Sequence, residues 1–391
     1  MASERPILVV GAGIAGLALA LGLARHGRAV LVLESRPRFD AVGAGIQLGS
    51  NGVRVLQRLG VAERLRAKVG EPVALTILHG RSAGTLAQLP LGASFAARYG
   101  APYWTMHRSD LHEALAAAAA AEPGILLRSS SALASVRQEA SGVLATNILG
   151  ESLAGEALVG ADGLWSTVRG AICPGAALRF AGATAARAVL AAEAAGPLAV
   201  PRVGLWLGSG ANVVHYPVRA GKEIAVVVIA RQNDTAPGWD NRVETASVLA
   251  RLAGFHRSLT EVLARAGDYR QWSLFRLPPL PSWSTGRIGL IGDAAHPMLP
   301  HLAQGGALAL EDAWVLARLW RESNADLALG LRQFEGQRRA RAARVVALSR
   351  HNGHLYHLRP PLAWARDAAL RLLPASWMLA GYDRLYGWRP D

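Results

Sequence analysis

The chain has 391 residues, 51% of them hydrophobic, and a formal net charge of +14 at pH 7. This length allows two domains, each with its own core, and excludes a short tail or linker. Only Lys68 and Lys222 are lysines, and the arginines are spread along the chain. The densest basic run, residues 338–344, has helical spacing and no interleaved aromatic residues. We therefore do not expect nucleic acid as a partner, in spite of the positive charge.

The single cysteine, Cys173, excludes an internal disulfide and a cysteine-based metal cluster, and we expect no metal. Gly, Pro or a charged residue interrupts each apolar run before it reaches about 18 residues, so no membrane span is expected. The first residues lack a secretory hydrophobic segment. Together these features predict a cytoplasmic protein.

The first 36 residues have the pattern strand, glycine turn, helix and strand. A β-rich run precedes Gly11, Gly13 and Gly16, a helical pattern follows them, and a second β-rich run ends in Glu34. In such a unit the glycines permit a tight turn, approach of a pyrophosphate to the helix amides, and close helix packing. Glu34 is placed to accept hydrogen bonds from ribose hydroxyls. The pattern predicts a dinucleotide site and leaves FAD and NAD(P) open, since Arg36 fits a 2′-phosphate or a solvated surface equally well.

A second glycine-rich loop, residues 42–51, opens another helical pattern, which starts at Val53. A loop of this kind lets a flat ring lie against backbone. Residues 72–100 predict short strands, with turns at glycines that include Gly80 and Gly92. A helix follows, with Ser109 as its predicted N-cap.

Residues 125–159 predict three or four short strands, which lead into Asp162 and a further helix. From about 182 to 276, β-rich runs with tight turns predict an antiparallel sheet, followed by two helices. We interpret this region as a second, substrate-covering domain inserted into the first, with the proline-rich residues 277–281 as the link back.

A third strand-to-helix junction lies near residue 300. An apolar run ends in Asp293, a proline-punctuated loop follows, and Gly305 and Gly306 lead into a helical pattern from Ala307. The first amides of a helix are unpaired and carry roughly half a positive charge, which suits an electron-rich ligand. Asp293 is placed to accept hydrogen bonds from sugar hydroxyls, although an ordinary N-cap region would have the same pattern. A long helix over 327–351 and a Trp-rich helical end complete the chain.

Taken together, these motifs resemble those of the single-component FAD-dependent aromatic hydroxylases, and most closely the branch of salicylate, 3-hydroxybenzoate and 6-hydroxynicotinate hydroxylases. The motifs that carry the resemblance are Gly11-Ala-Gly-Ile-Ala-Gly16 with Glu34, Gly43-Ala-Gly-Ile-Gln47, His107-Arg108-Ser-Asp-Leu, Gly160-Ala-Asp-Gly163 and Gly289-Leu-Ile-Gly-Asp-Ala-Ala-His-Pro297. They extend over nearly the whole chain. The resemblance therefore selects FAD as the tightly held dinucleotide.

The resemblance implies a mixed α/β (α+β) fold like that of p-hydroxybenzoate hydroxylase. A Rossmann-like FAD-binding domain would comprise residues 1–72, 101–181 and 277–350. An inserted, mainly antiparallel β-sheet substrate domain would comprise residues 73–100 and 182–276. Residues 351–391 would form a helical C-terminal segment.

The resemblance also implies the residues that contact FAD. They are Gly11, Gly13, Ala15, Gly16, Glu34, Ser35, Arg36, Gly45, Ile46, Arg108, Asp162, Asp293, Pro300, Gly305, Gly306 and Ala307. The group from the first glycine turn would hold the ADP half, Arg108 and Asp162 would approach the pyrophosphate, and Asp293 the ribityl chain. The amides of residues 305–307 would face the pyrimidine edge of the flavin.

The implied reaction is reduction of FAD by NAD(P)H, capture of O₂ as a flavin C4a-hydroperoxide, and transfer of one oxygen to a small phenolic or hydroxypyridine-type ring. NAD(P)H would bind transiently, because no second glycine fingerprint is present. Moving a phenol proton to a histidine costs about 5 kcal/mol, so we expect a polar cluster and not a single base. The enzyme would be a monomer or a homodimer.

Five residues are candidates for the substrate pocket: Gln47, Asn212, His215, Tyr216 and His301. The branch typically carries a histidine where this chain has Asn212, and asparagine can orient a substrate but cannot take its proton. His301 matches a histidine that resembles a substrate contact in the hydroxynicotinate hydroxylases. His215 and Tyr216 alternate along a strand, so one of them should face the other side of the sheet.

Two alternatives remain open. One is a flavin epoxidase or quinone-pathway hydroxylase that acts on a larger hydrophobic substrate. The other is a flavin-binding module that has lost hydroxylation, which the asparagine at position 212 would allow.

Overall fold

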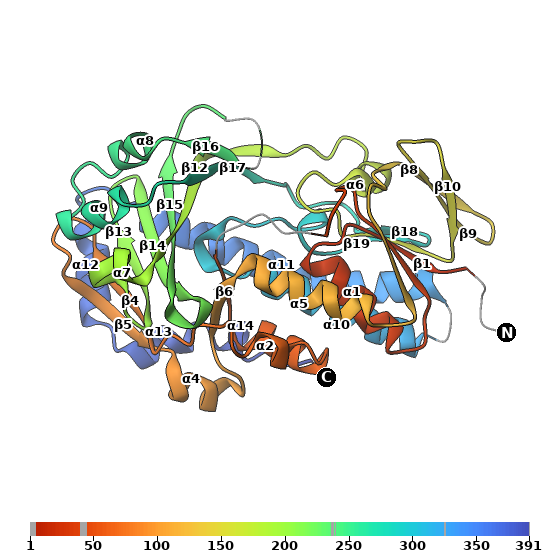
Figure 1. Cartoon of the computed structure of the whole chain (residues 1–391), viewed down its shortest axis with the longest axis horizontal. Helices are drawn as coiled ribbons and strands as arrows, with labels where there is room; N and C mark the ends of the chain where they lie inside the picture. The colour runs from red at the N-terminus through yellow and green to blue at the C-terminus, as the bar shows by residue number, and fades with distance from the viewer. Residues whose placement is uncertain (1–4, 40–44, 236–237, 239, 324–325, 391) are drawn as a thin grey trace.

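Figure 1 presents the computed structural model of the chain, which describes residues 5–39, 45–235, 238, 240–323 and 326–390. Most of the expected loop at 42–51 is thus described, but residues 42–44 lie outside this set. Two large sheets lie at opposite ends of the molecule, and long helices run beneath and between them.

A six-stranded, mainly parallel sheet forms the first part of the molecule. In spatial order its strands are β18 (Ser284–Thr285), β19 (Ile288–Leu290), β11 (Leu158–Gly160), β1 (Ile7–Val10), β2 (Val30–Leu33) and β7 (Ile125–Arg128). Only the pair β18 and β19 is antiparallel. The residues of β1, β2, β11 and β19 are all buried, as expected for strands covered on both faces.

Helices cover this sheet and connect its strands. On one face α1 (Ile14–Ala24) packs against α5 (Arg108–Ala120) and α10 (Gly305–Glu322), and α2 (Ser50–Arg58) packs against α10. Strands β8 (Leu133–Glu139), β9 (Gly142–Asn147) and β10 (Ser152–Gly155) form a separate antiparallel sheet. The expected Rossmann-like arrangement of β1, α1 and β2 is confirmed.

An eight-stranded sheet forms the second part. Its order is β16 (Asn241–Val243), β17 (Tyr269–Arg276), β12 (Arg179–Ala191), β15 (Glu223–Arg231), β14 (Ala211–Val218), β13 (Arg202–Leu207), β4 (Ala74–His79) and β5 (Thr85–Pro90). All neighbouring pairs are antiparallel except β13 and β4. Helices α8 (Thr245–Ala250) and α9 (Arg257–Ala264) pack on one face, where Val213, Val226 and Val228 belong to their core. The opposite face carries Val214, Tyr216 and Val227.

A short antiparallel pair, β3 (Gly45–Leu48) and β6 (Trp104–His107), links the two parts of the molecule, since β6 contacts β14 and β3 contacts α10. Helix α3 (Ala62–Leu65) packs against α2 and α5. At the other junctions α6 (Thr167–Ile172) and α7 (Ala192–Ala195) are single short helices.

The prediction of strands alone in residues 72–100 was wrong. Residues 92–99 form the helix α4 (Gly92–Tyr99), so Gly92 begins a helix and is not a turn between strands. Phe95 and Tyr99, four residues apart, bury one face of this helix in an aromatic cluster, and Gly100 ends it with a φ of 81°. The N-cap prediction for Ser109 was also wrong, since His107 occupies the cap of α5 and Ser109 lies within the first turn.

Strands β12 and β17 were not predicted from the sequence. Strand β12 is rich in alanine, which has a low preference for strands, but it pairs along its length with β15 and β17. It also begins at Arg179, slightly before the domain boundary expected at residue 182.

The C-terminal part is helical, as expected. It comprises α11 (Leu327–Tyr356), α12 (Leu362–Leu372), α13 (Ala375–Ala380) and α14 (Asp383–Tyr386). Helix α11 continues to Tyr356, so the boundary expected at residue 351 falls inside a helix. Helices α12 and α13 contact β5, and α14 contacts α2. No helix among the described residues is long and apolar enough to cross a membrane.

Candidate functional site

The first glycine turn has the backbone geometry that its sequence predicts. Gly11 has a φ of 101°, and a Cβ there would lie 2.5 Å from the Ala161 carbonyl oxygen. A Cβ on Gly16 would lie 1.9 Å from the Gly11 carbonyl oxygen, so only glycine allows α1 to approach the turn this closely. Around Gly13 a Cβ would meet nothing within 4 Å, and the N-terminus of α1 is therefore open.

Glu34 closes on this turn from the end of β2. Its Oε2 accepts a hydrogen bond from the Ala12 amide at 2.9 Å, and its Oε1 accepts from the Arg36 amide at 2.9 Å and the Ser35 hydroxyl at 3.1 Å. The carboxylate thus holds the glycine turn and the residues after β2 in fixed positions.

Asp162 connects the second junction to α6. Its Oδ2 accepts a hydrogen bond from the Val168 amide at 3.1 Å, whereas its Oδ1 is buried without a partner among the described residues. Burial raises the pKa of this carboxyl, and the hydrogen bonds from Ser166 and the start of α6 oppose the shift. Asp162 is therefore a capping residue with one acceptor still free.

Asp293 follows β19 in the short 3₁₀ turn η3 (Gly292–Ala294). Protein surrounds the residue, yet its side chain remains accessible because it faces a cavity. Burial raises the pKa of this carboxyl, while His296 and Arg108 lower it. The turn itself is fixed by the Gly292 amide, which donates to Asp312 Oδ2 of α10 at 3.0 Å.

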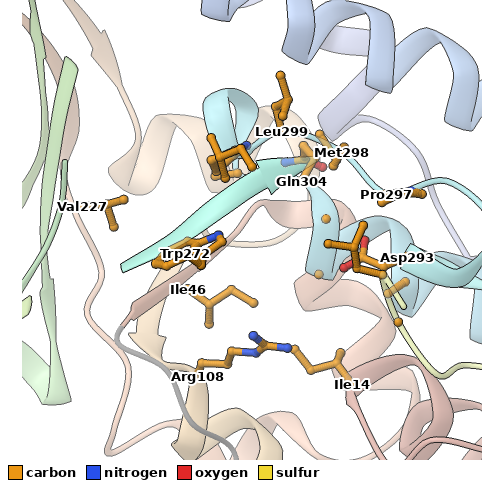
Figure 2. A pocket seen from close by; sticks show the side chains of 18 of the residues that line it. Ile14, Ile46, Arg108, Val227, Trp272, Asp293, Pro297, Met298, Leu299 and Gln304 are labelled. Carbon is orange, nitrogen blue, oxygen red and sulfur yellow. The ribbon is translucent and has the colours of Figure 1, made fainter. Parts of the chain in front are cut away.

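The cavity, of about 350 Å³, lies where these junctions meet the eight-stranded sheet. In Figure 2, Trp272 and Val227 border one side, the loop residues Met298, Leu299 and Gln304 border another, and Arg108 reaches toward Ile14. The N-termini of α1 and α10 adjoin it, and neither has a side-chain cap, so their first amides are available to a ligand.

The structure brings eleven of the expected site residues to the wall of this cavity: Gly13, Ala15, Gly45, Ile46, Gln47, Arg108, Tyr216, Asp293, Pro300, Gly305 and Gly306. The remaining residues expected to contact FAD lie at the three junctions beside it: Gly11, Gly16, Glu34, Ser35, Arg36, Asp162 and Ala307. The candidate pocket residues Asn212, His215 and His301 are not part of its lining.

Tyr216 is the aromatic residue of β14 that faces the cavity. Burial raises the pKa of its phenol, and nearby Arg187 opposes the shift, so the hydroxyl is protonated at neutral pH. Gly45 packs directly on the ring, where a Cβ would lie 2.4 Å from Tyr216 Cε2. Beside it, the Tyr103 hydroxyl donates to Gln47 Oε1 at 2.9 Å. Gln47 and Tyr216 therefore form a polar wall of neutral groups.

His215 points away from the cavity, contrary to its inclusion among the candidate pocket residues. Alternation along β14 turns it to the other face, where Trp206 Nε1 donates to His215 Nδ1 at 3.2 Å. Burial lowers the pKa of this imidazole to about 3, and Arg202 adds to the shift. The ring is a buried neutral side chain of the sheet.

Asn212 and His301 lie just behind the cavity wall. Asn212 is on the same face of β14 as Tyr216, and its Oδ1 lies 2.8 Å from His357 Nε2. His301 is in the 3₁₀ turn η4 (Pro300–Leu302) and its ring packs against Gly353 and Tyr356 of α11. Burial lowers the pKa of His301 to about 4. Both side chains are thus enclosed between the wall and α11.

Arg187 and Trp272 are cavity residues that the sequence did not reveal. The Arg187 guanidinium carbon lies 4.9 Å from the Trp272 ring centroid, and its Nη2 lies 2.8 Å from Asp240 Oδ1. They belong to β12 and β17, the two strands that were not predicted. An arginine at position 187, in an otherwise alanine-rich run, was the feature of the sequence that could have indicated a functional strand here.

Comparison with known proteins gives one consistent result. The FAD binding domain family matches residues 4–349. A 3-amino-4-hydroxybenzoate 2-monooxygenase of Streptomyces platensis is 38% identical over 99% of this chain and 97% of its own length. A 3-hydroxybenzoate 6-hydroxylase of Klebsiella oxytoca is 34% identical over 100% and 98%. A salicylate hydroxylase in a substrate complex superposes with a TM-score of 0.81 and 26% identity, covering 100% of both chains.

This chain belongs to the FAD binding domain family. It is a flavoprotein monooxygenase, and FAD is its cofactor. The expected resemblance to the hydroxylase branch and the expected fold class are confirmed. The residues present fit FAD: two uncapped helix N-termini border one cavity, an accessible carboxylate faces it, and Asp162 retains a free acceptor.

Proposed function

We propose that this monooxygenase hydroxylates a small aromatic ring of the phenolic or hydroxypyridine type, with NAD(P)H and O₂ as co-substrates. The observation that carries the proposal is that one cavity is bordered by both uncapped helix N-termini and by the aromatic face of the eight-stranded sheet. The names of the three similar proteins, all of which act on small hydroxylated aromatic acids, favour this reading over an epoxidase or a binding module.

The proposal assigns the cofactor to the junction residues. The glycine turn from Gly11 to Gly16, with Glu34, would hold the ADP half, and Arg108, Asp162 and Asp293 would contact the phosphates and the ribityl chain. The amides of residues 305–307, at the N-terminus of α10, would face the flavin ring, where they favour negative charge. When bound, FAD supplies the reaction of its reduced form with O₂ and the transfer of one oxygen.

The chain's own residues orient the ring and exclude water. Tyr216 is protonated at neutral pH and so acts as a hydrogen-bond donor, and Gln47 beside it has both donor and acceptor groups. Trp272 and Val227 supply apolar surface against which a ring packs. The loop from Pro297 to Gln304 separates the flavin side from the sheet side.

Asn212 has no basic atom, so we propose that it orients the substrate and does not take a proton. His301 is neutral above pH about 4 and belongs to the loop from Pro297 to Gln304, so its imidazole is the candidate group that can accept a proton. An alkaline optimum, or a substrate that reacts without deprotonation, is expected if no base replaces the missing histidine. A neutral optimum with a simple phenol, kept in Asn212→Ala but lost in His301→Ala, would instead assign the base to His301.

The proposal also includes the division into a FAD-binding part and a substrate-binding part. The FAD-binding part would contain the six-stranded sheet, and the substrate-binding part the eight-stranded sheet, with the ring between them. We propose a cytoplasmic monomer or homodimer.

The experiment is a product screen on the purified, yellow protein. NADH and NADPH oxidation is followed with hydroxybenzoates, salicylate, hydroxypyridines and aminobenzoates, and each product is examined by mass spectrometry for one added oxygen atom. We expect one ring class to stimulate oxidation and to gain one oxygen. Formation of hydrogen peroxide alone with every ring would contradict the proposal.

A further inference from the structure

The C-terminal end of α11 brings His357 against the cavity-facing side of the eight-stranded sheet. His357 Nε2 lies 2.8 Å from Asn212 Oδ1, and both side chains are buried. Because an amide oxygen can only accept, the imidazole carries its proton on Nε2 and donates it. Burial, with His301 adding to it, lowers the pKa of His357 to about 3, so the ring is neutral near pH 7.

Asn212 lies two residues along β14 from Val214, which lines the cavity. It lies on the same face of β14 as Val214 and Tyr216, which border the cavity. Its direct partner across the sheet, Ile229 of β15, borders the cavity as well. The buried amide therefore lies directly behind the end of the wall that a substrate ring would face.

The hydrogen bond from His357 determines which end of the Asn212 amide is engaged. Oδ1 is occupied, whereas Nδ2 is buried and has no partner among the described residues. His301 Nδ1, on a ring whose centroid lies 5.7 Å from that of His357, is buried without a described partner in the same way. An unpaired buried donor costs about 1–3 kcal/mol, so an acceptor is expected to meet it in the working enzyme.

We propose that His357 is a positioning residue for the substrate: it holds the Asn212 amide so that Nδ2 donates a hydrogen bond to an oxygen of the bound ring. This inference rests on the proposed function, because it takes the ligand to be an oxygen-bearing ring. In this inference the ring's oxygen reaches the buried Asn212 amide beside Val214 and Ile229, and His357 acts through Asn212. Since Nδ2 only donates, the pair favours a ring with an acceptor oxygen, such as a phenolate or a pyridone carbonyl, at this end.

The test measures binding of a matched pair of rings to the FAD-loaded protein. Dissociation constants of benzoate and of the three hydroxybenzoates are obtained from the change in flavin absorbance. The best hydroxybenzoate is expected to bind more tightly than benzoate in the wild type. Asn212→Ala and His357→Ala should each reduce this preference by roughly tenfold, the effect of one lost hydrogen bond.

A double variant and two further variants separate positioning from support of the fold. If His357 acts through Asn212, the variant with both residues changed to Ala should lose no more preference than Asn212→Ala alone. His357→Gln, which retains an N–H donor, should recover part of the preference. His351→Gln changes an exposed histidine of α11, the helix that precedes His357, and should leave the preference unchanged.

Two outcomes would overturn the inference. In one, the preference for the hydroxylated ring survives in His357→Ala, or the two single losses add in the double variant. In the other, benzoate and hydroxybenzoate weaken equally, which assigns His357 to the fold alone. If His357→Ala does not fold, His357→Gln and Asn212→Ala make the same comparison. Product analysis of the wild type tests the proposed reaction separately. The preference for the hydroxylated ring is obtained from dissociation constants and does not require that the ring be hydroxylated.

Discussion

At the scale of single residues, Gly45 explains how the cavity wall keeps its shape. A Cβ at this position would lie 2.4 Å from Tyr216 Cε2 and 2.8 Å from Ala225 Cβ. Gly306, at the start of α10, differs, because the one close contact of a Cβ there would be the end of the flexible Ile46 side chain at 2.7 Å, with Leu48 Cδ2 at an ordinary 3.6 Å. The Tyr216 ring therefore requires glycine at position 45, whereas position 306 should tolerate a small side chain better.

We expect Gly45→Ala to displace the Tyr216 ring and to raise KM for the aromatic substrate about tenfold, since overpacking of a filled site costs about 1–3 kcal/mol. Steady-state kinetics with the substrate found in the product screen measure the change. Gly170→Ala is the control, because a Cβ there meets nothing within 4 Å. Unchanged KM in Gly45→Ala would contradict the packing argument.

Tyr216→Phe removes one hydroxyl and keeps the ring. Because the phenol is protonated at neutral pH and borders the cavity, its loss should weaken substrate binding about tenfold while FAD remains bound. Flavin absorbance titrations measure the affinity for the ring. Loss of FAD together with the ring would show that the residue supports the cofactor site instead.

At the scale of elements, a buried ionic network joins α10 to α11. Arg338 Nε lies 2.7 Å from Asp312 Oδ1, and its Nη2 lies 2.8 Å from Glu311 Oε2. His296 Nε2 lies 2.6 Å from Asp312 Oδ2, which also accepts from the Gly292 amide. The network thus connects the long helix α11 to the turn that carries Asp293.

Arg338→Met should lower the free energy of unfolding by about 3 kcal/mol, because it removes the buried cation that contacts both carboxylates. The variant leaves Glu311 paired with Arg341 and Asp312 paired with His296. Urea unfolding followed by circular dichroism measures the loss. Arg344→Met, an exposed position of the same helix, serves as the matched control and should change the value little. Equal stability of the two variants would mean that the network contributes nothing.

Acid should weaken the same network. Burial alone would raise the pKa of Asp312, but His296, Arg338 and the Gly292 amide lower it from 3.8 to about 2. The carboxylate therefore contributes about 2 kcal/mol above pH 3.8, and this contribution disappears as the pH falls to about 2. The difference in unfolding free energy between wild type and Asp312→Asn should shrink over that interval. A pH-independent difference would contradict the assigned pKa.

At the scale of the whole molecule, the cavity joins parts that the chain reaches by different routes. The six-stranded sheet contributes its junctions, the eight-stranded sheet contributes one face, and the end of α11 lies behind the wall. A cofactor that binds among them stabilises their arrangement.

Removal of FAD should lower the melting temperature, and FAD added back should raise it in a concentration-dependent manner. Binding to the folded state alone adds about 2.7 kcal/mol at a ligand concentration of 100 Kd. Thermal unfolding of the apoprotein across an FAD titration measures this, with riboflavin, which lacks the ADP half, as the matched control. A melting temperature that FAD does not change would contradict the assignment of the junction residues.

The glycine turns and the carboxylates at strand ends could be predicted from sequence because their geometry is local. Gly11, Gly16 and Glu34 act within one strand-turn-helix-strand unit. Asp293 and Gly305 likewise belong to one local unit, a strand followed by a loop and a helix. The order of these motifs along the chain also predicted the fold class and the family, because several motifs in the same order are far more specific than any one of them.

Only the tertiary structure decided which side chains face the cavity. The alanine-rich strand β12 forms because β15 and β17 pair with it, and this pairing brings Arg187 and Trp272 to the site. Alternation along β14 allowed two orientations, and packing against α8 and α9 on one face turned Tyr216 inward. His357 meets Asn212 across 145 positions of sequence. Such contacts depend on how separate elements pack, and no local pattern of residues encodes them.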